Sequence, residues 1–344
     1  MAPHRNTNVR SRLVDVAELA GVAVSTASKA LHGNSEIAAS TRLAVLTAAD
    51  RLGYRPSGIS ARLRSGRTAA IGLITPDQIG RFSLPVVSGA EGAFGPGRVL
   101  VLSCQSRGDD LHPDQQVEVL LEHGVDGIIV LADDTNPRPS LGRVGVPIVY
   151  AYGRSEDPHD VSIIPDEAAG AALAVQHLIS IGRTRIAHVT GPKRFDATVR
   201  RARASRKTLD EARLRLAAGR VFYGEWTQDW GTQAVDQLLN EDPLVDAIFA
   251  ANDSIARGIC TGLALHGRRI PQDVAVIGFD DWAVVATTSR PHLSSVDMGL
   301  SSLGSAAAQA LFALIRGETV SGVQSIAPRL ILRESAAAVQ KTER

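Results

Sequence analysis

The stretch that decides the fold lies near the N-terminus, in LVDVAELAGVAVSTASKALHG (13–33) and TRLAVLTAADRLGYRPSGISARLRSG (41–66). Short apolar sets at helical spacing alternate here with glycine and small polar residues, which predicts three short helices. Gly21 stands where a helix needs a left-handed residue to end, and Ser40 is placed to cap the third helix. The pattern is typical of a helix-turn-helix, although a plain three-helix bundle would have similar local signals.

Charge is divided unevenly along the chain. Residues 1–67 hold ten arginines or lysines and four acids, a net charge of +6. The whole chain of 344 residues has 37 basic and 36 acidic side chains, so the remainder carries −5. A basic head on an acidic body is the distribution expected of a protein that contacts phosphates. The nearly neutral total therefore hides a candidate nucleic-acid-binding unit.

From residue 69 to about residue 340, short β-branched runs alternate with longer amphipathic stretches. The runs include AAIGLIT, RVLVLS, GIIVLA, PIVYAY, RIAHVT, AIFAA and VAVIGF. Alternation of this kind predicts parallel sheets with crossover helices. Because about 270 residues exceed one comfortable core, we expect two α/β subdomains.

Composition narrows the possible functions. Hydrophobic residues make up 44% of the chain, and no run of roughly 18 apolar residues could span a membrane. The N-terminal MAPHRNTNVRSRL lacks the apolar stretch of a signal peptide, which predicts a cytoplasmic protein. Cys104 and Cys260 do not make a disulfide framework. The nine histidines show no metal-ligand spacing, and HExxH, CxxC, GxSxG and phosphate-loop motifs are absent, so we expect no cofactor, no metal site and no enzymatic activity.

In the order of its motifs the chain resembles the LacI family (lac repressor-like) of bacterial transcriptional regulators. The head motifs are DVAELAGVAVSTASKAL, TRLAVLTAADRLGYRPS and ARLRSGRTAAIGLITP, and the body motifs are VDGIIVL, HLISIGRTRIAHVTGP, AIFAANDSIARG, DVAVIGFDD and LILRES. The resemblance implies a small all-α helix-turn-helix head and an α/β periplasmic-binding-protein-like body of two doubly wound subdomains. It also implies a repressor that binds a palindromic operator in double-stranded DNA as a homodimer, under the control of a small-molecule effector such as a sugar or sugar phosphate.

The resemblance also implies domain boundaries. Residues 1–11 are expected to form a disordered basic tail, 12–56 the DNA-binding domain, and 57–68 the hinge helix and linker. The effector-binding and dimerisation body is expected to span 69–340 and to cross between its lobes three times. The expected lobes are an N-lobe of 69–165 and 297–321, and a C-lobe of 166–296 and 322–340. Because the tail Ala336–Arg344 holds no heptads, we expect dimers rather than tetramers.

The family pattern assigns nine DNA-contacting positions, which are Val24, Ser25, Thr26, Ser28, Lys29, Arg42, Tyr54, Ser57 and Leu63. Val24 suits a thymine methyl and Lys29 a guanine edge, while Ser25 discriminates little. Thr26, Ser28 and Arg42 are expected to hold phosphates. Leu63 matches the leucine that wedges between base pairs in the minor groove, although a plain linker is the alternative for its segment. Ala23 stands where a serine usually caps the recognition helix, a loss of about 1 kcal/mol.

For the cleft between the lobes the family pattern assigns eight effector-binding positions, which are Asp77, Phe82, Asp166, Arg201, Trp226, Asn252, Asp253 and Asp280. Their carboxylates and amide suit hydroxyl donors, and their aromatic faces suit a sugar ring. Asp253 has a second interpretation as a helix cap, and Trp226 as a packing residue.

Several departures from the family pattern bear on the ligand. The loop Gly-Arg-Phe-Ser at 80–83 replaces the usual Asn-Pro-Phe-Phe. Tyr152–Gly153 and Met298 replace polar residues, which argues against a simple hexose. Arg81, if it points inward beside Arg201, favours a phosphorylated or carboxylated ligand.

Two other functions stay open at this stage. One is an architectural DNA-binding protein whose cleft binds nothing, which the altered loop at 80–83 supports. The other is a solute receptor, which the basic head and the missing signal peptide oppose. Within the first interpretation, the effector could act as an inducer or as a corepressor.

Overall fold

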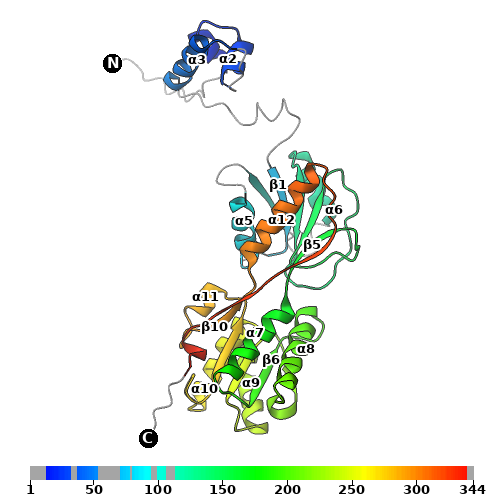
Figure 1. Cartoon of the computed structure of the whole chain (residues 1–344), viewed down its shortest axis with the longest axis vertical. Helices are drawn as coiled ribbons and strands as arrows, with labels where there is room; N and C mark the ends of the chain where they lie inside the picture. The colour runs from blue at the N-terminus through cyan, green and yellow to red at the C-terminus, as the bar shows by residue number, and fades with distance from the viewer. Residues whose placement is uncertain are drawn as a thin grey trace, which may run out of the picture. The chain divides into compact units, whose positions relative to one another are not determined.

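The structure, a computed structural model, describes residues 13–31, 37–52, 70–77, 80–93, 99–105 and 113–338. The chain divides into two compact units, Met1–Thr68 and Ala69–Arg344, each with its own core (Figure 1). The expected tail at 1–11 and the expected hinge, with Tyr54, Ser57 and Leu63, lie outside the described residues. Among the described helices, none is long and apolar enough to cross a membrane.

The head consists of three described helices, α1 (Leu13–Leu19), α2 (Val24–Leu31) and α3 (Ala39–Arg51). The buried apolar residues of their core are valines and alanines, namely Val16, Ala17, Ala27, Ala30, Val45, Ala48 and Ala49, and partly buried leucines and an isoleucine pack against them. Gly21, between α1 and α2, has a φ of +67°, the left-handed conformation that the sequence predicted. The prediction for Ser40 is wrong, because the chain turns helical after Ala38 and Ser40 already lies in the first turn of α3.

The first lobe of the body is built on a six-stranded parallel sheet. Its order is β11-β5-β4-β3-β1-β2, with β1 (Ala70–Thr75), β2 (Leu100–Gln105), β3 (Gly127–Leu131), β4 (Ile148–Ala151), β5 (Val161–Pro165) and β11 (Gly322–Ile326). Helices α5 (Ser83–Gly92), α6 (Pro113–Glu122) and α12 (Leu300–Ile315) pack against it (Figure 1). Gly89 and Gly304 allow α5 and α12 to approach closely, since a Cβ on Gly304 would lie 2.0 Å from the carbonyl oxygen of Val86.

The second lobe is built on the other six-stranded sheet, in the order β12-β10-β9-β8-β6-β7. Its strands are β6 (Ile186–Thr190), β7 (Val221–Tyr223), β8 (Ala247–Ala250), β9 (Ala275–Phe279), β10 (Ser294–Asp297) and β12 (Arg329–Ile331), and only β12 runs antiparallel to its neighbour. Its helices are α7 (Glu167–Ser180), α8 (Asp196–Glu211), α9 (Gln228–Glu241), α10 (Asp253–Leu265) and α11 (Ala283–Ala286). The predicted fold class, a small helical head and a two-sheet α/β body, is confirmed.

The chain crosses between the lobes at three places: after β5, between β10 and α12, and between β11 and β12 (Figure 1). The third crossing corrects the expected boundary at 321/322. Residues Gly322–Ile326 pair in parallel with Val161–Pro165 of the first sheet. Because a strand belongs to the sheet that satisfies its backbone hydrogen bonds, this segment is part of the N-lobe.

Candidate functional site

Helix α2 of the head presents three of the predicted DNA-contacting side chains to solvent. Val24 is 44% exposed, and Ser25 and Lys29 are exposed as well. The opposite side of the helix, with Ala27 and Ala30, is buried in the head core. An apolar group, a hydroxyl and an ammonium therefore lie on the solvent-facing side of a short helix, the chemistry that reads base edges in a major groove.

The three side chains expected to hold phosphates differ in accessibility. Thr26 and Arg42 are partly exposed. Ser28 is only 3% exposed, because it lies on the side of α2 that packs into the head. A phosphate contact from the Ser28 hydroxyl is therefore not supported by its position, which corrects that expectation.

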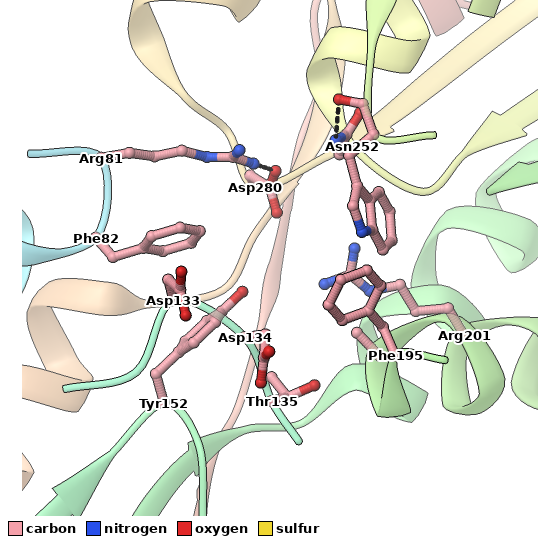
Figure 2. Close-up of a pocket in the computed structure, with 12 residues that line it drawn as sticks. Arg81, Phe82, Asp133, Asp134, Thr135, Tyr152, Phe195, Arg201, Asn252 and Asp280 are labelled. Carbon is pink, nitrogen blue, oxygen red and sulfur yellow. Dashed lines mark hydrogen bonds and ion pairs between the residues drawn. The ribbon is translucent and has the colours of Figure 1, made fainter. Parts of the chain in front are cut away.

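A cavity of about 250 Å³ lies in the body, lined by loops that follow strands of both sheets. Five of the eight predicted effector positions line it, which are Phe82, Arg201, Trp226, Asn252 and Asp280 (Figure 2). Binding sites of α/β folds form at the carboxyl ends of the strands, and this cavity occupies that place in both lobes. Its volume is slightly below the usual range for drug-sized ligands, so it suits a small molecule.

The remaining three predicted positions do not line the cavity, because each carboxylate is used by the backbone or by a neighbouring side chain. Asp77 accepts hydrogen bonds from the backbone nitrogens of Phe82 and Ser83, both at 2.7 Å, and from the Ser83 hydroxyl. Burial raises its pKa, but these hydrogen bonds outweigh burial and the net pKa is lowered. Asp166 caps helix α7 by accepting from the Ala169 nitrogen at 2.9 Å.

Asp253 is fully buried and holds the loop after β9. Its carboxylate accepts from the Trp282 nitrogen at 2.7 Å and from the Ser295 hydroxyl at 2.5 Å. Burial raises the pKa of Asp253 to about 7. The cap of α10 is Asn252, which accepts from the Ile255 nitrogen at 2.7 Å. The geometry therefore supports neither the effector contact nor the helix cap that the sequence suggested for Asp253.

Asp280 lies in a strained turn at the end of β9. It has a φ of +102° and the next residue, Asp281, a φ of +48°, conformations that cost non-glycine residues free energy and cluster at functional sites. The Asp280 nitrogen donates to the Val296 oxygen at 2.8 Å. This turn aims the Asp280 carboxylate at the N-lobe, where it pairs with Arg81.

Both guanidinium groups of the cavity have carboxylate partners. Arg201 donates its Nε to Glu167 at 2.5 Å and an Nη to the Ala251 carbonyl, and its Cζ lies 3.7 Å from the centroid of the Phe279 ring. Arg81 points inward and forms its ion pair with Asp280. The charge of Arg81 is thereby compensated, so the expectation that it would select a phosphate or carboxylate is not supported.

The sequence prediction missed Asp133, Asp134 and Thr135, which line the cavity directly after β3. It also missed two aromatic side chains. Tyr152 lies 4.8 Å from Phe82 between ring centroids, and Phe195 lies 5.9 Å from Trp226. The aspartates follow the buried run GIIVLA, so the rule applied to Asn252, that polar residues ending a buried strand need partners, could have found them. Tyr152 stands out in the sequence only as a departure from the family pattern, and no comparable signal marks Phe195.

One further hydrogen bond connects the lobes beside the cavity. The Asn136 side-chain oxygen, just after Thr135, accepts from the Asp196 nitrogen at the start of α8 at 2.7 Å. The Tyr152 hydroxyl donates at 3.7 Å to the sulfur of Met298, which lies on the crossing between β10 and α12. Together with the Arg81–Asp280 pair, the Asn136–Asp196 contact joins both walls of the site.

Comparison with known proteins places both units. Residues 12–57 match the model for bacterial regulatory proteins of the lacI family, and residues 175–336 match the periplasmic binding protein-like domain. The chain is 33% identical to the HTH-type transcriptional regulator reg1 of Streptomyces lividans, over 95% of this chain and 97% of that protein.

Two solved structures are similar over nearly the whole chain. One is a complex of the transcriptional regulator CelR with cellobiose, with 30% identity and a TM-score of 0.66 over 95% of this chain and all of that one. The other is the lac repressor dimer bound to operator and the anti-inducer ONPF, with 26% identity and a TM-score of 0.75 over 96% of this chain and all of that one.

Proposed function

The chain belongs to the lacI family of bacterial regulatory proteins, and from that premise we propose a separate role in regulation for each of its two units. It is a DNA-binding transcriptional regulator, as the resemblance predicted. We propose that it acts as a repressor, that two heads bind a palindromic operator, and that a small effector in the body cavity releases them. The operator-bound dimer of the lac repressor and the cellobiose complex of CelR support these two roles, operator binding and effector binding.

The observation that carries the DNA-binding proposal is the exposed row Val24, Ser25 and Lys29 on a helix of the basic head. We propose that these side chains read bases and that Thr26, Arg42, Tyr54 and Ser57 contact the backbone. Leu63 is proposed to wedge into the minor groove, which favours a flexible pyrimidine–purine step at the operator centre.

Selection from random DNA tests this proposal, and an imperfect palindrome is the expected result. Lys29→Ala is then expected to weaken binding to the selected site by about 1–3 kcal/mol and to relax preference at one base pair of each half-site. Glu18, exposed on α1, provides a control in Glu18→Gln. Recovery of a single, asymmetric half-site would contradict the dimeric arrangement.

For the cavity, we propose a small polyhydroxylated effector that lies between the aromatic pairs and whose hydroxyls reach Asn252 and the carboxylates. Arg201, Trp226 and Asp280 remain proposed effector contacts, while Asp77, Asp166 and Asp253 hold the loops. Thermal-shift screening with sugars, sugar phosphates and nucleosides, followed by operator binding with each hit, tests this. An effector that stabilises the protein without changing operator affinity would argue against regulation through this cavity.

We further propose that the protein acts in the cytoplasm, on nucleoid DNA, and that it binds its effector without a catalytic step. The support is that the similar proteins named above are transcriptional regulators. Recovery of the effector chemically unchanged after prolonged incubation is the expected result.

A further inference from the structure

The charges of the cavity do not balance once its ion pairs are assigned. Arg81 is paired with Asp280, and Arg201 is paired with Glu167. Asp133 and Asp134 also line the cavity, and the described part of the chain offers neither of them an ion pair. Two carboxylates therefore face the ligand space without a cationic partner.

The hydrogen bonds of Asp134 come from neutral donors. Asp134 is partly buried and accepts from the Asn136 nitrogen at 2.8 Å and from the Asn136 side-chain amide at 3.4 Å. Burial raises the pKa of Asp134, the hydrogen bond from the Asn136 nitrogen lowers it, the negative charge of Asp133 raises it and Arg138 lowers it, and the net pKa is raised. Asp133 is exposed at the edge of the cavity. A cation between the two carboxylates would relieve both burial and mutual repulsion.

Thr135 gives an independent indication of a ligand. It is 7% exposed and lines the same cavity, yet its hydroxyl oxygen is buried and has no hydrogen-bond partner among the described residues. Figure 2 shows Asp133, Asp134 and Thr135 one after another, between Phe82 and Tyr152 on one side and Phe195 on the other. A buried hydroxyl without a hydrogen-bond partner costs free energy, and a donor on the ligand would supply that partner.

We propose that the effector carries a protonated primary amine, held by Asp133, Asp134 and Thr135, so that the ligand is an amino sugar or a similar amino polyol. This inference rests on the proposed role of the cavity as the effector site. An ammonium group offers three donors, which matches two carboxylates and one hydroxyl. The aromatic rings around the segment add attraction for a cation. The same arrangement repels a phosphate and leaves a neutral hydroxyl with weaker hydrogen bonds.

The test uses glucose, galactose and mannose, each as the neutral sugar, the 2-amino sugar and the 6-phosphate. Titration calorimetry on the full chain at about pH 6.5, where an amine of this kind is protonated, measures each affinity, and operator binding is measured with every ligand. We expect an amino sugar to bind at least about tenfold more tightly than its neutral and phosphorylated counterparts. Asp133→Asn and Asp134→Asn are each expected to remove most of that preference, because they lower the affinity for the amino sugar far more than the affinity for the neutral sugar.

Asp229→Asn, exposed on α9 and outside the cavity lining, is the matched control and should keep the preference. Thermal melting of each variant verifies that it is folded. If a neutral sugar or a phosphate binds most tightly, the amine proposal is overturned while the effector role of the cavity stands. If no member of the panel binds or changes operator affinity, both the amine proposal and the sugar-effector proposal are overturned.

Discussion

The two walls of the cavity use their polar residues in opposite ways. In the C-lobe wall and directly behind it, Arg201 pairs with Glu167, Asn252 accepts from the Ile255 nitrogen, and Asp253 accepts from the Trp282 nitrogen. In the N-lobe wall, the segment Asp133–Thr135 follows its strand in the same position, but its two aspartates line the cavity without an ion pair, and the buried Thr135 hydroxyl has no hydrogen-bond partner among the described residues. Polar residues at equivalent strand ends therefore stabilise loops and helices in the C-lobe, whereas those in the N-lobe are available to a ligand.

The largest expected effect comes from breaking the C-lobe wall. Glu167→Ala leaves the buried Arg201 guanidinium without its carboxylate, and we expect a loss of about 3–5 kcal/mol in the free energy of unfolding. Glu211→Ala removes the exposed partner of Lys207 and should cost at most about 1 kcal/mol. Urea denaturation measures both. Equal losses for the two variants would show that the C-lobe wall is not built on this pair.

Asp253 makes the C-lobe wall sensitive to pH. Its folded pKa of about 7 is above the ordinary value of 3.8, so between these values the folded state holds a proton that the unfolded chain releases. This group alone therefore lowers stability as pH rises from about 4 to about 7. His188, whose pKa burial lowers to about 4, has the opposite effect in an overlapping range.

The difference between wild type and Asp253→Asn isolates the contribution of Asp253. Asparagine can accept from the Trp282 nitrogen through its oxygen and donate to Ser295 through its amide. We expect the variant to gain stability relative to wild type as pH rises from about 4 to about 7, by urea denaturation across that range. A difference that is independent of pH would contradict the raised pKa.

The smallest expected effect concerns the ion pair between the walls. Asp280→Asn releases the positive charge of Arg81 into the cavity, so affinity for a sugar 6-phosphate should rise about tenfold relative to the neutral sugar, about 1.4 kcal/mol. Calorimetry with glucose and glucose 6-phosphate measures the change. An unaltered ratio would mean that Asp280 does not compensate Arg81 in solution.

The alternation of buried strands with helices was enough to predict two α/β lobes, and the family pattern identified five residues that line the cavity. What the sequence could not reveal is how a carboxylate at a strand end is used. Asp77, Asp166 and Asp253 resemble ligand contacts in sequence, but each is engaged by amides whose positions depend on loop geometry. The third crossing was misplaced for a related reason, because GVQSI (322–326) is largely exposed at the sheet edge and lacks an apolar run that predicts a strand.

The three crossings between the lobes have a consequence for the order of folding during synthesis. Nearly all of the C-lobe is encoded in one uninterrupted stretch, 166–297, and lacks only β12 and the last turn. The N-lobe begins first, yet its helix α12 begins 135 residues after the end of β5 and its edge strand β11 follows α12. Because domains fold as their parts leave the ribosome, the lobe that starts first still lacks α12 and β11 when nearly all of its partner has been made, and a premature stop near residue 300 deprives both sheets of a strand.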